Sequence, residues 1–292
     1  MKQETMTATG GHTLRTWLAM PSTQKRRSIR YHLRRAWTRV APWCPVPLRL
    51  YPGIWWIARN DAVSDELWQG VFEPNERALL RTLVEPGMVV LDVGAHAGFY
   101  SLNASRLVGP SGRVIAFEPS PRERKRLRLH LRLNRCANVT VEGAALGASS
   151  GEGHLFVFDG RTTGCNSFQL ASTVGARQVT VPICTLDQYV ADGIVNRVDF
   201  VKMDIEGAEL SALRGAEELF RTRRPTLLCE LHDKRTAPWG YRARDIVDLV
   251  ASWGYRWYSV GDRGRVTPID ASQTAFFGNG VALPVERPWP DR

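Results

Sequence analysis

The chain of 292 residues is short of the features that mark secreted, zinc-binding and membrane-spanning proteins. Its five cysteines and six histidines are scattered, with no C-x-x-C pair and no ligand spacing typical of zinc. No apolar run approaches the roughly 18 residues of a spanning helix. The N-terminus has no apolar core of the signal-peptide type before its basic stretch. We therefore expect a cytoplasmic protein with free thiols.

Acidic residues are scarce in two segments, and this scarcity gives the chain its net charge of +10. Residues 1–40 hold nine lysines and arginines against Glu4 alone, and residues 122–135 hold seven against Glu123. The rest of the chain is acidic in balance, so the basic charge is local and does not cover the whole surface. No RNP-type aromatic pattern accompanies these segments, so nucleic acid is disfavoured as a partner.

Strand and helix patterns alternate over most of the chain after residue 60. Apolar strands are predicted at 89–93, 113–118, 139–142, 199–204 and 226–231. Helices are predicted at 98–108, 122–134, 208–221 and 242–253. Such alternation is typical of an α/β fold with a doubly wound, mostly parallel sheet. Ligands bind such sheets at the carboxyl ends of the strands, so polar residues just after strands are of interest.

Two segments depart from this alternation. Residues 144–197 carry short β-like runs between glycine-rich turns, which predicts a β-rich insert. Residues 1–60 form a basic N-terminal extension that we expect to be partly disordered, then helical over 25–40 and then extended. Three tryptophans of the extension are expected to pack against the main domain, residues 61–292: Trp43, Trp55 and Trp56.

The stretch VVLDVGAHAGFYS, residues 89–101, places a glycine-rich turn between a strand and a helix. His96 occupies the middle position of the dinucleotide fingerprint G-x-G-x-x-G, where a glycine normally admits a pyrophosphate. Asp92 would repel a phosphate but suits a cationic ligand. Glu118 ends the next strand, 24 positions after Gly94, where an acidic side chain can hydrogen-bond ribose hydroxyls. A ligand with a ribose, a positive charge and no phosphate points to S-adenosylmethionine (SAM).

The chain resembles the FkbM-type family of SAM-dependent methyltransferases over residues 60–284. The resemblance rests on motifs that occur in the family's order and spacing: LDVGAHAG, AFEPSP, AALG, TLDQY, VKMDIEGAELSALRGA and VALP. The KMDIEGAE block is the most specific of them. The resemblance implies the class I methyltransferase fold, a Rossmann-like sheet of seven strands whose last strand is antiparallel. His96 stands where the family often has asparagine, so the resemblance assigns it no role.

Family and physical chemistry together predict a SAM site around the glycine turn. Asp92 is expected near the methionine end of SAM, and Glu118 on the ribose. Further contacts are expected from the turn, from the start of the following helix and from the residues after the third strand: Gly94, Ala95, Gly98, Phe99, Ser101, Gly143 and Ala144. Core packing explains Phe99 equally well.

Methyl transfer to a hydroxyl calls for a carboxylate or histidine that takes the hydroxyl proton. Asp204 and Glu206 follow the fourth strand, and Glu230 and His232 end the fifth. Each pair is spaced so that both side chains share one face of the sheet. We predict Asp204, Glu206 and His232 as catalytic residues, with Asp204 the strongest candidate. Substrate contacts are expected from Glu230 and from two residues of the insert, Asn166 and Ser167.

Two carboxylates and His232 could also hold a divalent cation such as Mg²⁺ that acidifies a substrate hydroxyl. No further ligand is evident in the sequence, so we assign no metal site and rank this below plain base catalysis. The expected acceptor is a small molecule or glycan with a free hydroxyl: a sugar, a glycolipid or a secondary metabolite. An RNA-directed methyltransferase, an NAD-dependent oxidoreductase and a non-enzymatic binding module remain alternatives. The sequence carries no signal for an oligomeric state.

The predicted helix over residues 25–40 is amphipathic. Its apolar stripe consists of Ile29, Leu33, Ala36 and Val40, with Trp37 near the seam. Basic residues cover its other faces: Lys25, Arg26, Arg27, Arg30, Arg34, Arg35 and Arg39. We favour packing of the stripe on the catalytic domain, because appended helices usually bury their apolar face on their own protein. The alternative is a peripheral position at an anionic membrane surface.

Overall fold

The computed structural model describes residues 21–41, 43–50, 53–158, 166–169, 172, 174–287 and 289. Our expectation of disorder at the start of the extension concerns residues 1–23, of which residues 1–20 lie outside the described residues. It is wrong at its end, because a helix already begins at Ser22. The described N-terminal part forms helices and one hairpin: α2 (Ser22–Val40), β1 (Val46–Leu50), β2 (Ile54–Ala58), α3 (Ala62–Gln69) and α4 (Pro74–Leu83).

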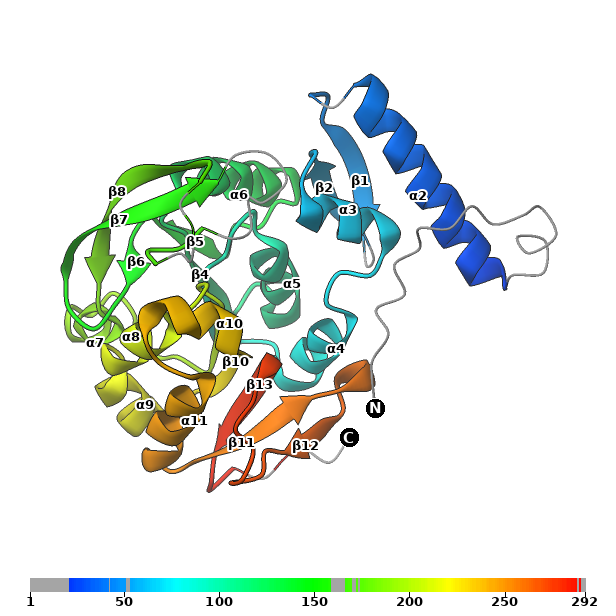
Figure 1. Ribbon diagram of the computed structural model, residues 1–292. Helices are drawn as coiled ribbons and strands as arrows, with labels where there is room; N and C mark the ends of the chain where they lie inside the picture. The colour runs from blue at the N-terminus through cyan, green and yellow to red at the C-terminus, as the bar shows by residue number, and fades with distance from the viewer. Residues whose placement is uncertain are drawn as a thin grey trace.

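A central sheet of eight strands follows (Figure 1), in the order β12-β11-β13-β10-β9-β3-β4-β5. Its strands are β3 (Val89–Val93), β4 (Arg113–Phe117), β5 (Val139–Glu142), β9 (Phe200–Met203), β10 (Thr226–His232), β11 (Tyr255–Val260), β12 (Val266–Pro268) and β13 (Phe277–Pro284). The five strands from β5 to β10 pair in parallel, whereas β13 is antiparallel to both of its neighbours. The predicted fold class is therefore confirmed, and β12 adds a short eighth strand at the edge.

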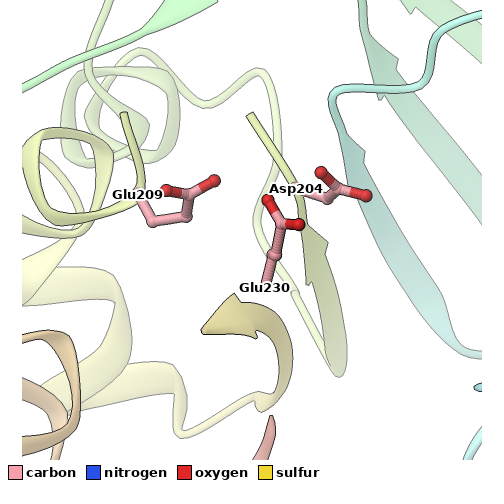
Figure 2. A group of neighbouring side chains, drawn as sticks. All are labelled: Asp204, Glu209 and Glu230. Atoms are coloured by element: carbon pink, nitrogen blue, oxygen red, sulfur yellow. The ribbon is translucent and has the colours of Figure 1, made fainter. Parts of the chain in front are cut away.

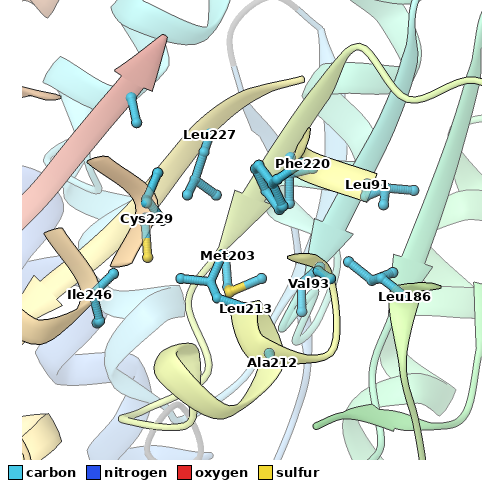
Figure 3. Close-up of a cluster of buried hydrophobic side chains, with 14 of the residues drawn as sticks. Leu91, Val93, Leu186, Met203, Ala212, Leu213, Phe220, Leu227, Cys229 and Ile246 are labelled. Carbon is cyan, nitrogen blue, oxygen red and sulfur yellow. The ribbon is translucent and has the colours of Figure 1, made fainter. Parts of the chain in front are cut away.

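Helices cover both faces of this sheet. Successive residues of each strand point to opposite sides, so the strands contribute side chains to two cores. The helices are α5 (Phe99–Val108), α6 (Pro121–Leu133), α7 (Leu186–Ala191), α8 (Glu209–Arg214), α9 (Glu217–Arg223), α10 (Asp233–Thr236) and α11 (Ala243–Ser252), with short 3-10 turns at Ala237–Trp239 and Asp262–Gly264. One core, drawn in Figure 3, joins Leu91, Val93 and Met203 to α7, α8, α9 and α11. The other core joins Val90 and Phe200 to α4, α5 and α6.

The helix predicted over residues 208–221 is two helices, α8 and α9, which meet at Gly215. A Cβ at Gly215 would lie 2.1 Å from the carbonyl oxygen of Gly147, so the chain passes directly against the insert here. The Gly215 carbonyl leaves the helical pattern and accepts a hydrogen bond from the amide of Asp187. Tertiary contact, which the apolar period does not encode, therefore interrupts the helix.

The predicted β-rich insert is confirmed as a separate three-stranded sheet. Its strands are β6 (Ala145–Leu146), β7 (Gly151–Phe158) and β8 (Ala176–Cys184), in the order β6-β8-β7. They enclose a small core of their own, formed by Ala145, Leu155, Val157 and Val181.

The extended stretch after α2 forms a β-hairpin of β1 and β2. The sequence analysis did not predict these strands, because the stretch is rich in proline, which is uncommon within strands. Trp56 is fully buried and packs against the His130 ring at 4.1 Å between centroids, as expected. The same expectation is wrong for Trp43 and Trp55, which are 79% and 42% exposed. Trp55 alternates with the buried Ile54 and Trp56 on β2 and must therefore point outward.

The favoured orientation of the basic helix α2 is also wrong. Among the side chains of α2 whose burial is described, the buried one is Arg34. Its Nε donates to Asp65 Oδ1 at 2.8 Å, and its guanidinium lies 5.6 Å from the Trp68 ring centroid. The predicted apolar stripe faces outward, because α3 offers a carboxylate and an indole, which suit an arginine better than an aliphatic face. None of the described helices combines the length and apolar content that crossing a bilayer requires.

Candidate active site

A cavity lies where β3, β4 and β9 end. This is the carboxyl edge of the parallel strands, where doubly wound sheets bind ligands. Strand ends supply part of its wall, and the β-rich insert supplies Leu155 and Phe168 on the other side. Its described lining brings together six of the predicted site residues: Gly94, Glu118, Ala144, Asn166, Asp204 and Glu206.

The turn between β3 and α5 is clamped between the neighbouring strands. The amides of Gly94 and Ala95 both donate to the carbonyl of Phe117, at 3.1 and 3.0 Å. Gly94 has φ +82°, and a Cβ there would lie 1.9 Å from the carbonyl oxygen of Asp204. Only glycine satisfies both conditions, so the turn holds the start of α5 close to the end of β9.

Glu118, which follows β4, lines the cavity and is held by two backbone amides. Its Oε2 accepts from His96 N at 2.7 Å, and its Oε1 accepts from Ser120 N at 2.8 Å. Burial raises the pKa of Glu118 to about 8, although both amides act in the opposite direction. Each oxygen keeps a lone pair that can accept from a ligand hydroxyl.

His96 also lines the cavity, which the sequence argument did not predict. It adopts φ +49°, and its buried Nε2 has no hydrogen-bond partner among the described residues. Burial lowers the pKa of His96 to about 4, so the ring is neutral at physiological pH. The one available signal in the sequence was its place in the glycine turn, at the middle position of the dinucleotide fingerprint.

Asp92 does not belong to the described lining of the cavity. It is 1% exposed and accepts a hydrogen bond from Ser101 Oγ at 2.5 Å on the other face of the sheet. Its neighbour Val93 faces the cavity in its place, as strand alternation requires. Five other predicted cofactor contacts also lie outside that lining: Ala95, Gly98, Phe99, Ser101 and Gly143. Phe99 packs edge-on against Phe72 in the core.

Lys202, a residue the sequence argument missed, balances the charge behind the site. Its ammonium lies 3.1 Å from Asp204 Oδ2 and 4.7 Å from the Tyr100 ring centroid, with 6% of the residue exposed. Burial lowers the pKa of Lys202, but the attraction of Asp204, Asp92 and Glu73 raises it by more. Lys202 could have been found from its spacing. It precedes Asp204 by two positions, and positions two apart on a strand share a face.

Asp204 is one of three carboxylates that lie close together (Figure 2). Oxygens of Asp204, Glu209 and Glu230 lie within 4.8 Å of one another, although the side chains come from three separate elements. Glu209 is 1% exposed, and its Oε1 accepts from Ile205 N at 2.8 Å. Burial raises the pKa of Glu209 to about 7, and burial together with the neighbouring carboxylates raises the pKa of Glu230. Glu209 was not predicted, because it lies in the first turn of α8 and the search was confined to residues just after strands.

Glu206 is held in a strained backbone conformation at the cavity wall, with φ +56°. Ser167 Oγ donates to the Glu206 carbonyl at 2.9 Å, and Arg235 Nε lies 2.9 Å from Glu206 Oε2. Burial and the nearby Asp204 raise the pKa of Glu206. Ser167 therefore contacts the backbone of Glu206, whereas Asn166 reaches the cavity itself.

His232 has a role in local structure. Its Nδ1 accepts from Lys234 N at 3.2 Å and so caps α10, and its ring meets Phe277 edge-on at 5.8 Å. Neither His232 nor Glu230 is part of the described cavity lining.

Comparison with curated proteins finds relatives of moderate identity. Hexuronic acid methyltransferase AglP of Haloferax volcanii is 30% identical over 154 residues, which cover 52% of this chain and 60% of AglP. The 31-O-demethyl-FK506 methyltransferase FkbM of Streptomyces tacrolimicus is 27% identical over 203 residues, covering 60% of this chain and 76% of that protein. The AMB antimetabolite synthetase AmbE of Pseudomonas aeruginosa is 27% identical over 228 residues. That match covers 66% of this chain and only 10% of AmbE.

Among solved structures, the methyltransferase FkbM of Methylobacillus flagellatus has a TM-score of 0.43 and 18% identity, covering 77% of this chain and 56% of that one. Residues 92–257 match the family described as the methyltransferase FkbM domain. This match begins at the glycine turn, contains Glu118, Asp204, Glu206 and the whole β-rich insert, and spans more than half of the sequence. The chain therefore belongs to the FkbM methyltransferase domain family.

Proposed function

We propose that the protein is a SAM-dependent methyltransferase that acts on a hydroxyl group. The observation that carries this proposal is the cavity lined by an acceptor for ribose hydroxyls, Glu118, and by the carboxylates of Asp204 and Glu206. Membership of the FkbM family supports it.

The residues of the cavity fit SAM. Gly94 brings the backbone to the cavity, and Glu118 offers two oxygens already oriented by amides. Apolar side chains, among them Phe117 and Leu146, suit an adenine ring. When bound, SAM supplies an electrophilic methyl group on a sulfonium. NAD fits less well, because its pyrophosphate needs the close approach that His96 obstructs.

We propose Glu206 as the residue that takes the hydroxyl proton. It lines the cavity, and its raised pKa makes it a stronger base near neutral pH than an ordinary carboxylate. Asp204, fixed by Lys202 at 3.1 Å, orients the hydroxyl. Ser167 holds the backbone of Glu206 and is a positioning residue.

For the acceptor, we propose a hydroxyl on a sugar, a glycolipid or a secondary metabolite. Two relatives are named for a hexuronic acid and for 31-O-demethyl-FK506, which are molecules of this kind. Asn166 is the insert residue best placed to contact such an acceptor, because it lines the cavity with the carboxylates.

A second arrangement places a divalent cation such as Mg²⁺ between Asp204, Glu209 and Glu230. Clustered carboxylate oxygens are the ligands Mg²⁺ prefers, and the buried Glu209 Oε2 has no partner among the described residues. The cation would acidify a substrate hydroxyl. Lys202 already neutralises part of this charge, so we rank the metal second. Activity lost to a chelator and restored by Mg²⁺ would reverse the ranking.

Calorimetry tests the cofactor. Glu118→Ala removes the acceptor for two hydroxyls, worth about 1.5–3 kcal/mol for a charged group, so SAM affinity should fall roughly tenfold or more. Glu118→Gln, which keeps one acceptor, should fall less, and the exposed Glu152→Ala is the control. The assignment fails if Glu118→Ala binds SAM like the unchanged protein, or if NAD binds more tightly than SAM.

Turnover and its pH profile test the base. Glu206→Gln should lose roughly a hundredfold in kcat, with SAM affinity little changed. In the unchanged protein kcat should rise with pH through the raised pKa of Glu206, because only the carboxylate accepts a proton. Asp204→Asn should lose less. The opposite order, with Asp204→Asn the more damaging change, would make Asp204 the base.

A further inference from the structure

The outer face of α2 is apolar, which is the reverse of the usual arrangement for a helix on a protein surface. Ile29, Leu33 and Val40 are 47%, 59% and 76% exposed, and Trp37 between them is 38% exposed. Their spacing of three and four residues puts all four on one side of the helix. We call these four residues the outer stripe.

The inner face of α2 is fixed by polar contacts, so the outer stripe cannot simply rotate inward. Arg34 pairs with Asp65 at 2.8 Å, and Trp68 Nε1 donates to the carbonyl of Arg30 at 2.8 Å. Rotation would strip a buried guanidinium of its carboxylate, which is costly. The helix is thus held with its apolar side outward.

Basic charge flanks the outer stripe. The exposed residues Arg30 and Arg39 lie on either side of it, the exposed Arg35 lies further round the helix, and α2 contains no acidic residue. The side chains of Arg26 and Arg27, which belong to the same predicted basic face, lie outside the described part of the helix. An apolar stripe between arginines matches the boundary between acyl chains and anionic headgroups. A second copy of the same basic helix would be repelled.

Further apolar side chains are exposed on the segment after α2, on the hairpin and on α6. Trp43, just beyond α2, is 79% exposed, and Trp55 on the hairpin is 42% exposed. Asn134, at the end of α6, hydrogen-bonds the backbone of Trp55, and the adjacent Leu133 is also exposed. Eight of the twelve large apolar residues exposed in the described chain belong to α2, the segment after it, the hairpin or α6. Figure 1 shows α2 beside α3 and the hairpin, α6 on the other side of the hairpin, and β11 and β12 away from all of them.

We propose that the outer stripe and its arginines dock the protein on an anionic lipid surface, with α2 lying in the headgroup region. Tryptophan suits this depth, since its ring is apolar and its N–H is polar. The proposal concerns where the protein works and does not depend on the methyl-transfer chemistry. Docking would concentrate the protein near a lipid-linked acceptor.

Co-sedimentation with vesicles tests the proposal directly. The full chain should pellet with vesicles of phosphatidylcholine and phosphatidylglycerol at low salt. It should be released as salt rises, because the Debye length falls from about 10 Å at 0.1 M to about 3 Å at 1 M. It should not bind vesicles of phosphatidylcholine alone with comparable strength.

Two variants separate the apolar and the charged contributions. The triple variant Ile29→Ser, Leu33→Ser and Val40→Ser should bind at least about tenfold more weakly. Arg35→Gln with Arg39→Gln should weaken binding by roughly 25-fold, since each charge is worth about 1 kcal/mol, or about fivefold, near an anionic leaflet.

Matched controls make the same changes far from α2. Val174→Ser with Val285→Ser removes exposed apolar side chains elsewhere, and Arg256→Gln with Arg265→Gln removes exposed charges at β11 and β12. Both controls should bind like the unchanged protein. SAM calorimetry and thermal unfolding show that each variant is folded.

Three results would overturn the proposal: no binding by the full chain, equal binding by the triple variant, or equal binding to neutral vesicles. If the triple variant lowers the sedimentation mass of the protein and lipid binding is absent, the outer stripe joins two copies and the membrane assignment is wrong. A failure of methyl transfer leaves the vesicle assay unaffected, so the two proposals fail separately.

Discussion

Replacing Lys202 by methionine removes the positive charge that three acidic side chains share. Its ammonium contacts Asp204 directly and attracts Asp92 and Glu73. Methionine fills a similar volume, so the packing against the Tyr100 ring is largely kept. The change therefore isolates the charge.

The expected cost is about 3–5 kcal/mol near pH 8, the usual range when one partner of a buried pair is removed. In a domain of this size 1 kcal/mol is worth about 2–4 °C, so the midpoint should fall by about 6–20 °C. The loss should shrink near pH 5.5. Lys202 lowers the pKa values of Glu73 and Asp92, and without it both carboxyls take up protons more readily as the pH falls.

Thermal or urea unfolding at the two pH values measures this cost. Arg197→Met is the matched control, because Arg197 pairs with Asp199 at 2.8 Å but is 64% exposed. Such a surface pair is worth about 0–1 kcal/mol. A loss below about 1 kcal/mol in Lys202→Met, or an equal loss at both pH values, would refute the charge balance described here.

Two further predictions concern the turn and the acidic cluster. Gly94→Ala should destabilise the protein by about 3 kcal/mol or more in urea unfolding, because its Cβ would meet the Asp204 carbonyl at 1.9 Å. Gly175→Ala is the control: Gly175 has φ +79° and open space around it, so the change should cost about 1 kcal/mol. In thermal unfolding, the stability of Glu230→Gln relative to the unchanged protein should increase as pH rises from 6 to 9. The pKa of Glu230 in the folded protein is raised above the ordinary 4.5, so its protonated carboxyl contributes stability that is lost as pH rises. A pH-independent difference for Glu230→Gln would show that the carboxyl is not buried in its protonated form.

The sheet could be predicted because its strands are short, apolar and evenly separated by helical patterns. Positions just after strands can be predicted equally well, so the sequence analysis found Glu118, Asp204 and Glu206. All three line one cavity. Strand alternation also explains a limit of this reasoning. Asp92 belongs to the same motif, yet its neighbour Val93 takes the cavity face.

Orientation and long-range partners could not be predicted. The period of α2 identifies its apolar stripe, but the packed face is decided by Asp65 and Trp68, about thirty residues further along. The split at Gly215 depends on Gly147 in the insert. The role of Lys202 in charge balance depends on three acidic side chains that come close to it only in the folded chain.

The buried carboxyl groups in and beside the site can hold protons at neutral pH. Burial raises the pKa of Glu118 to about 8 and that of Glu209 to about 7, so at neutral pH these carboxyls are partly protonated. A cationic ligand such as SAM favours their ionised forms, and its arrival will expel protons into solution. The heat of binding should then differ between phosphate and Tris buffers, whose own ionisation heats differ. Mild acidification, by keeping those protons in place, will loosen the hold on the cofactor without changing a single residue.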